Sequence, residues 1–236
     1  MAVFKIICLA NSIKWRGRCM AGLRMDGGGW VRPVSDDESS KGALFSHHYT
    51  LPEGTEVRPL DVVQINVVRP FPQPHQPENW LIGNKPLRLE KHILEEEILS
   101  ILRSNIASGP DLLGNRADRI SYDMFARSPA SSSLVLIEPE NAYWYITKDI
   151  RNRRQVRAVF HLSGQPYNLV VTDPYCHERL RNLPPGCYPF YEAPGLKQDD
   201  KILFTISLGE PFEWDNCCYK LVAGVIVLPR HWRNRL

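Results

Sequence analysis

A glycine triplet near the N-terminus constrains the fold more than any other feature of the sequence. The motif D-G-G-G at residues 26–29 predicts the turn of a β-hairpin, because glycine adopts the positive φ angles of tight turns at little steric cost. The surrounding stretch, residues 12–34, is rich in cations and tryptophans. The members proposed for ligand contact are Lys14, Trp15, Arg16, Arg18, Trp30 and Arg32. The sequence therefore predicts a basic, aromatic hairpin around which the rest of the chain folds.

Trp30 and Arg32 are expected to form a pair on the returning arm of this hairpin. Residues two apart on a strand share a face, so both should project to one side while Val31 and Pro33 point to the other. Such a pair can stack on a base and hold its phosphate. The alternative is that Trp30 caps a barrel core and the arginines form a solvated rim. Spacing alone does not separate the two.

Composition restricts the classes of protein to which the chain can belong. Of its 236 residues, 43% are hydrophobic, which excludes a disordered chain and allows a sizeable core. The formal net charge of +3 is far below the excess expected of a protein that coats duplex DNA. Any nucleic-acid site must therefore arise from local clustering of cations.

The apolar start of the chain, residues 1–10, predicts a buried strand, since it is too short for a secretion signal. No apolar run reaches the length that spans a bilayer, and a soluble, cytoplasmic protein is expected. Without an export signal, the cysteines are expected to be reduced thiols rather than disulfides. They are Cys8, Cys19, Cys176, Cys187, Cys217 and Cys218.

Alternation and turn residues predict the elements of the first half. Strands are expected at 61–68 and 79–83, separated by an extended proline-rich segment at 70–77. Apolar residues at helical spacing predict a helix from about Leu89 to Arg103. Residues 111–133 have no sustained period and predict a connection between domains, with a boundary near Ser128. The expected domains are thus residues 1–128 and 129–236.

The second half predicts a succession of strands with one helix. The strands are expected at residues 134–137, 142–147, 155–160, 167–171, 201–208 and 221–228. Asp173-Pro174 predicts a helix start, with an N-cap followed by proline at the first helical position. The predicted fold class is mainly β with short helices, arranged as two tandem OB-like barrels. A β-sandwich uses similar pieces and stays open as an alternative.

Several motifs of this sequence resemble those of the prokaryotic dual OB-fold domain (DuOB) family. They lie at residues 5–12, 17–22, 30–35, 61–63, 78–81, 168–174, 207–211 and 219–224. The resemblance covers nearly the whole chain. It implies two tandem OB-like barrels in one cytoplasmic polypeptide that engages nucleic acid, with no established catalytic residues to carry over. Because OB barrels bind varied ligands, the resemblance by itself does not fix the function.

Sequence signatures of enzymes are missing. The chain contains no P-loop, no nucleophile elbow, no H-E-x-x-H and no dinucleotide fingerprint, so no catalytic residue and no cofactor are assigned. A zinc site would have to recruit Cys176, His177 and the later cysteines, but adjacent Cys-His and Cys-Cys pairs close poorly around a tetrahedral ion. No metal site is predicted. A hydrolase using Asp36, Glu38 or Asp173 would require folding to bring the carboxylates together.

Two further basic clusters are candidate contacts for nucleic acid. The first is near residue 150, between two predicted strands, and its arginines would follow a backbone whose bases stack on neighbouring aromatic residues. Its members are Arg151, Arg153, Arg154 and Arg157. The second is at residues 230–235 and is either an electrostatic tail or a protein contact. A solvated loop is the alternative for the first cluster.

These observations lead to a non-enzymatic protein that binds single-stranded DNA or RNA through a basic and aromatic OB-like face. The alternative function is a sensor of a nucleotide-like small molecule, or a protein-interaction adaptor, in a prokaryotic defence or repair system. The expected partners are single-stranded nucleic acid and a protein encoded in the same operon, with no role for a membrane.

Overall fold

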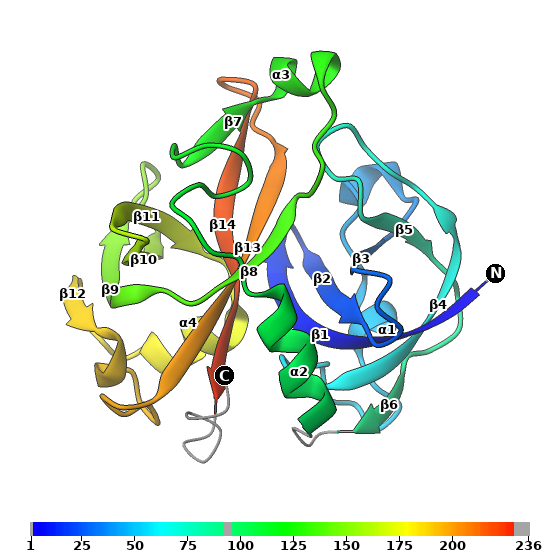
Figure 1. Cartoon of the computed structure of the whole chain (residues 1–236), viewed down its shortest axis with the longest axis horizontal. Coiled ribbons are helices and arrows are strands. Elements are labelled where there is room, and N and C mark those ends of the chain that lie inside the picture. The colour runs from blue at the N-terminus through cyan, green and yellow to red at the C-terminus, as the bar shows by residue number, and fades with distance from the viewer. Residues whose placement is uncertain (1, 92–95, 229–236) are drawn as a thin grey trace. The chain divides into compact units, whose positions relative to one another are not determined.

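The computed structural model describes residues 2–91 and 96–228, and its chain divides into two compact units (Figure 1). The first unit comprises Met1–Ser104 and Phe125–Ser133, and the second comprises Asn105–Met124 and Leu134–Leu236. Within the described residues, no helix is long and apolar enough to cross a bilayer. Each unit has its own hydrophobic core.

The first unit is built around a closed five-stranded barrel. Its strands are β1 (Ala2–Lys14), β2 (Gly17–Arg24), β3 (Trp30–Val34), β4 (Val62–Pro70), β5 (Asn79–Ile82) and the added β6 (Arg88–Lys91). The order is β1-β2-β3-β5-β4, and β4 pairs again with β1, which closes the barrel. All of these pairs are antiparallel except β3 with β5, which is parallel. The short helices η1 (Glu38–Ser40) and α1 (Ser46–Tyr49) lie between β3 and β4 in the sequence.

The predicted glycine turn is confirmed, and the stretch around it forms two hairpins rather than one. Gly27 and Gly29 have φ angles of 79° and 78°, and the Asp26 carboxylate accepts a hydrogen bond from Gly28 N at 3.1 Å. This turn joins β2 to β3. A second, tighter turn at Trp15 joins β1 to β2, where Lys14 pairs with Gly17. The second turn was not predicted, because it contains no Asn-Gly or Asp-Gly signal.

The second unit repeats the same strand order. Its strands are β7 (Arg119–Ser121), β8 (Leu134–Ile137), β9 (Glu140–Lys148), β10 (Arg154–Leu162), β11 (Gln165–Val171), β12 (Gly186–Pro189), β13 (Lys201–Pro211) and β14 (Cys217–Leu228). The path runs β9-β10-β11-β14-β13-β8, and only Glu138 and Pro139 separate β8 from β9. Strand β12 pairs with the other edge of β9 and extends the sheet at that end. As in the first unit, one pair within it, β11 with β14, is parallel.

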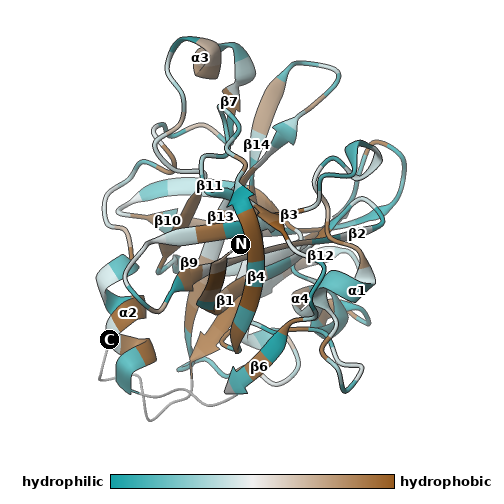
Figure 2. Ribbon diagram, turned by 90° about the vertical axis from the view of Figure 1, so that its right-hand side faces the viewer, coloured by the Kyte–Doolittle hydropathy of each residue, from teal (hydrophilic) through white to brown (hydrophobic). Residues whose placement is uncertain are grey.

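The shared order confirms the predicted fold class, mainly β with short helices and two OB-like barrels. In both units a helix follows the third strand, and a later antiparallel strand pair has its last member parallel to the third strand. In the second unit, β12 and η2 stand between the helix and this pair. This is a five-stranded Greek-key arrangement. Figure 2 shows the hydrophobic residues concentrated along the strands, in agreement with two barrel cores.

Helix α4 (Pro174–Leu180) begins where the sequence predicted. One carboxylate oxygen of Asp173 accepts hydrogen bonds from Tyr175 N at 2.8 Å and Cys176 N at 3.1 Å, while proline occupies the first helical position. The other oxygen accepts from Val225 N at 2.7 Å, which links the helix start to β14. Burial raises the pKa of this carboxyl group. Helix η2 (Phe190–Glu192) follows β12.

The helix predicted from Leu89 to Arg103 is wrong in its first part. Residues 88–91 form β6, in which Leu89 pairs with Val63 of β4. Helix α2 covers Glu96–Asn105, and the predicted residues 92–95 lie outside the described residues. Within α2 the predicted helix is confirmed, and the apolar residues Ile98, Leu99 and Leu102 are buried. Short apolar runs are compatible with either a helix or a strand. At Leu89 the pairing with a distant strand decided in favour of the strand.

The predicted connection at residues 111–133 is a structured segment. Leu112 belongs to the core of the second unit, β7 pairs with β14, and helix α3 (Tyr122–Arg127) follows directly. Residues 105–124 consequently group with the second unit. The elements in this segment are only three and six residues long, too short to leave a periodic pattern, and the sequence therefore indicated a linker. A boundary near Ser128 between independently folding domains stays a prediction.

Candidate nucleic-acid interface

The tip of the β1/β2 hairpin gathers three of the predicted cations and tryptophans. Trp15 is 62% exposed and has a φ of 53°, a conformation uncommon for a residue with a side chain. The Nζ of Lys41, from the loop after η1, lies 4.6 Å from the centre of the Trp15 ring. Lys14 Nζ lies beside Gly42, and Arg16 is exposed. This tip therefore presents an exposed aromatic ring with one ammonium over it and two further cations next to it in the chain.

Arg18 belongs to the same hairpin, but a carboxylate occupies its guanidinium. Its Nε and Nη2 donate to the two carboxylate oxygens of Glu56 at 3.0 and 3.2 Å. The guanidinium carbon also lies 5.5 Å from the centre of the Tyr49 ring. A bidentate pair of this kind neutralises the charge and fixes the side chain. Arg18 therefore supports the fold around α1 more directly than it offers a phosphate contact.

Trp30 and Arg32 do not form the predicted surface pair. Trp30 is half-buried, and Arg32 is 0% exposed, with its Nη1 donating to Asn79 Oδ1 at 3.5 Å. The alternation itself is as expected, since Val31 between them belongs to the barrel core. Strand β3 lies between β2 and β5, and the face that carries Arg32 is covered. Strand alternation predicts which side chains share a face, but it does not predict whether that face meets solvent.

The outer face of β9, β10 and β11 carries exposed aromatics in the second unit. Along β9 the odd residues Tyr143 and Tyr145 are 42% and 39% exposed, while Ala142, Trp144 and Ile146 are buried. Strands β10 and β11 alternate in the same way. In an OB barrel, oligonucleotides bind across the second and third strands and the loops beside them. Here the corresponding strands are β10 and β11.

Arg157 occupies the middle of this outer face. It lies opposite Tyr145 of β9 on one side and Val170 of β11 on the other. Its Nε and Nη2 donate to the side chain and backbone oxygens of Asn168 at 2.6 and 2.7 Å, and its Nη1 donates to Gln155 Oε1 at 3.1 Å. Partial burial lowers the pKa of Arg157, yet a guanidinium keeps its charge in proteins. The group is thus oriented beside an exposed aromatic ring.

The turn between β9 and β10 carries the next two predicted arginines. Asp149 accepts hydrogen bonds from the backbone N of Arg151 and of Arg153, and it forms an ion pair with the Arg153 side chain at 2.7 Å. These bonds lower the pKa of Asp149. Ile150 at the tip is 90% exposed. Among the described residues, the guanidinium of Arg151 meets no acceptor, so its charge is available to a ligand.

Arg154 has a structural role. Its Nη1 and Nη2 donate to the backbone oxygens of Leu183 and Leu180 at 2.8 and 2.6 Å, at the C-terminal end of α4. The last carbonyls of a helix lack partners within the helix and favour a cation. The cluster predicted at residues 151–157 is therefore divided between α4 (Arg154), a local ion pair (Arg153) and the outer face (Arg151 and Arg157).

The turn between β13 and β14 exposes two further aromatics that the sequence analysis did not single out. Trp214 is 76% exposed and Phe212 is 50% exposed. Asp215 in the same turn accepts a hydrogen bond from the Tyr219 hydroxyl at 2.7 Å, and that hydroxyl accepts from Arg119 at 2.8 Å. In an OB barrel this is the loop between the fourth and fifth strands, which contributes to ligand binding.

Several residues of the candidate interface were not predicted from the sequence, and the reason differs for each. Lys41 is separated from Trp15 by two strands and a loop, so only the fold brings them together. Tyr143 was present in a predicted strand whose burial alternation gives the outward position, and that signal was available in the sequence. The cluster at residues 230–235 lies outside the described residues.

Three comparisons with known proteins were made, and one of them shows the family to which the chain belongs. A comparison with curated proteins found no match. The crystal structure of the p204 HINb domain aligns with a TM-score of 0.33 at 11% identity, over 96% of this chain and 97% of that chain. The tetrameric p202 HIN2 structure aligns with a TM-score of 0.28 at 6% identity, over 97% of this chain and 95% of that one. A family model for the dual OB-containing domain matches residues 4–225, and the chain therefore belongs to the dual OB-containing domain (DuOB) family.

Proposed function

We propose that this protein binds single-stranded DNA or RNA without catalysing a reaction on it. The observation that carries the proposal is the outer face of β9–β11, where Arg157 lies beside the exposed ring of Tyr145. A charged group that holds a phosphate next to a ring that stacks on a base is the basic unit of single-strand recognition. Arg157 lies on β10, which corresponds to one of the two strands that carry oligonucleotides in OB barrels, and Tyr145 lies on the neighbouring β9.

The hairpin tip of the first unit supports the proposal independently. Trp15 offers an exposed aromatic ring, Lys41 lies over it, and Lys14 and Arg16 are its neighbours in the chain. A net charge of only +3 over 236 residues means that such local groups, rather than a general basic surface, would provide the affinity. Each unit thus has a candidate contact region of its own, and the proposal applies to each unit by itself.

The cellular system in which the protein acts, and the type of nucleic acid that it binds, are part of the same proposal. The resemblance to the DuOB family implied a cytoplasmic protein of a prokaryote. A defence or repair system, with a protein partner from the same operon, is the setting proposed together with the alternative function. DNA and RNA present the same phosphates and stacking bases, so the contacts described do not favour either. A comparison of matched deoxyribose and ribose strands decides between them, because only RNA offers a 2′-hydroxyl to the protein.

Fluorescence anisotropy with labelled strands tests the proposal directly. Affinity should rise with strand length over about 4 to 16 nucleotides, the range of site sizes for OB barrels, and should fall as salt increases. Tyr145→Ala should weaken binding by roughly 1–3 kcal/mol, whereas Tyr145→Phe, which keeps the ring, should bind like wild type. Saturation by a mononucleotide, with no gain from longer strands, would instead identify a small-molecule sensor.

A further inference from the structure

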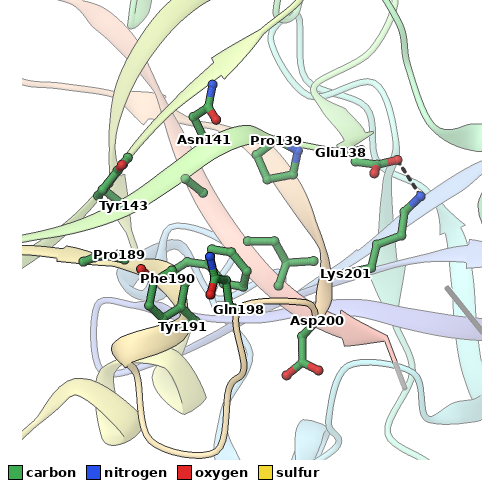
Figure 3. A pocket seen from close by; sticks show the side chains of 12 residues that line it. Glu138, Pro139, Asn141, Tyr143, Pro189, Phe190, Tyr191, Gln198, Asp200 and Lys201 are labelled. Carbon is green, nitrogen blue, oxygen red and sulfur yellow. Dashed lines mark ion pairs between the residues drawn. The ribbon is translucent and has the colours of Figure 1, made fainter. Parts of the chain in front are cut away.

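The second unit contains a pocket of about 500 Å³ that the outer face does not account for (Figure 3). Three segments line it, namely the entry to β9, the turn after β12 and the start of β13. Its size lies within the range of pockets that bind small molecules. All of its walls belong to one unit, so its shape depends only on that unit.

Aromatic rings form one side of the pocket. Tyr143 and Tyr191 are both exposed in part, at 42% and 37%, and Phe190 packs edge-on against Tyr191 with ring centres 5.7 Å apart. The buried indole of Trp144 donates to Phe190 O at 2.9 Å, which fixes η2 against β9. Strand pairing also places Pro189 opposite Tyr143. The aromatic side is therefore held in place before any ligand arrives.

The polar side of the pocket favours an uncharged ligand over a phosphate. Glu138 forms an ion pair with Lys201 at 2.9 Å, and Asp200 accepts a hydrogen bond from Lys197 N at 2.8 Å. The ammonium of Lys201 is thus already paired with Glu138, so a phosphate in the pocket would gain little from it. The amides of Asn141 and Gln198 add donors and acceptors. Aromatic walls with amide and carboxylate groups match the flat, neutral, hydrogen-bonding shape of a nucleobase.

Tyr143 connects this pocket to the proposed strand-binding face. It lines the pocket, and it also shares the outward face of β9 with Tyr145, two residues further along. Tyr145 in turn lies opposite Arg157. We infer that the pocket beside Tyr143 is a nucleobase site, and that, given the proposed function, it takes one unstacked base of the bound strand. The phosphates remain outside, toward Arg157 and Arg151, where the charge is positive.

Free nucleosides test the base site without reference to any strand. Saturation-transfer NMR on the full chain should show contact with the base protons of an uncharged nucleoside. Tyr191→Ala should weaken this binding between about 5-fold and about 150-fold, the range for loss of one stacking ring, while Tyr191→Phe should retain it. A 5′-monophosphate should bind no more tightly than its nucleoside, because the ammonium of Lys201 is already paired with Glu138.

Single abasic substitutions, moved along a fixed oligonucleotide, test the link to the strand. An abasic site at one position should lower the affinity of the protein for the oligonucleotide more than an abasic site at any other position. With the Tyr191→Ala variant, abasic sites at all positions should lower the affinity equally. Strand binding with equal losses at every position, together with nucleoside contacts that Tyr191→Ala leaves unchanged, would overturn the base site and leave the proposed function intact. Nucleoside binding that depends on Tyr191, without any strand binding, would support the base site and refute the proposed function. Thermal melting of each variant ensures that only folded protein is compared.

Discussion

Arg157 and Asn168 form a paired contact across two neighbouring strands, in which the Arg157 Nε donates to Asn168 Oδ1 at 2.6 Å. The backbone oxygen of Asn168 accepts a second bond from the same guanidinium at 2.7 Å. A planar guanidinium held at two points retains its orientation when a ligand binds, so little side-chain entropy is lost on binding. This contact makes Arg157 the best positioned cation of the outer face.

Arg157→Ala should therefore change the salt dependence of strand binding. The loss of one phosphate contact should reduce the slope of log affinity against log salt by about 0.7 for a single strand. Arg103→Ala is the matched control, because Arg103 is exposed on α2 in the first unit and its removal lowers the net charge equally. Equal slopes for wild type and Arg157→Ala in an anisotropy titration would remove Arg157 from the interface. Asn168→Ala should weaken binding with the slope unchanged, since no charge is lost.

Trp15→Ala should weaken strand binding and leave the stability of the protein nearly unchanged. The ring is largely exposed, and its removal should cost roughly 1–3 kcal/mol of binding to a short strand. The melting temperature should stay near that of wild type, because little buried surface is lost. Trp15→Gly offers a second check, since glycine adopts the positive φ at this position without strain and should not destabilise the turn. A Trp15→Ala protein with unaltered affinity would place the contact elsewhere.

Arg32→Ala should instead lower the stability of the protein and leave the affinity of the folded molecules unchanged. The side chain is fully buried, so its truncation leaves a cavity and removes the contact with Asn79. We expect a loss of at least about 2 kcal/mol in the free energy of unfolding, measured by urea titration. The affinity of molecules that remain folded should be unchanged. A stable Arg32→Ala protein with a reduced salt slope would restore the surface role first predicted for this residue.

Asp173→Ala should destabilise the second unit. The substitution removes the N-cap of α4, worth about 1 kcal/mol, and leaves the amide of Val225 without its carboxylate acceptor, worth a further 1–3 kcal/mol if that group stays buried. Asp173→Asn keeps one oxygen for the cap and should lose less stability. Comparable melting temperatures for the alanine and wild-type proteins would contradict the role assigned to this link.

His48 should make the stability of the first unit depend on pH. Burial, with a smaller effect of the neighbouring His47, lowers the pKa of His48 from 6.5 to about 4. Between these values the unfolded chain binds more protons than the folded one, so the contribution is complete above pH 6.5 and declines as the pH falls toward 4. His48→Asn keeps an acceptor for Phe45 N, which bonds to His48 Nδ1 at 3.2 Å, but does not titrate. The difference in unfolding free energy between the two proteins should change over this window by at most about 1.4 kcal/mol per pH unit.

The sequence by itself determined the elements whose causes are local. The glycine turn at residues 26–29, the alternating strands of the second half and the cap at Asp173 each depend on conformational preferences within a few residues. The mainly β class and the count of two barrels followed from these pieces and from the family resemblance. Local preference also explains the success within α2, where one helical face is apolar.

The tertiary structure alone decided which side chains meet solvent and which distant residues meet each other. Strand alternation places the side chains of Arg32 and Val31 on different faces of β3. Only the packed barrel shows that both of these faces are covered. The pairing of β4 with residues 88–91 converted a predicted helix start into a strand. The pocket beside Tyr143 is formed by segments up to about 60 residues apart, and contacts at that separation are set by the closure of the sheet rather than by local sequence.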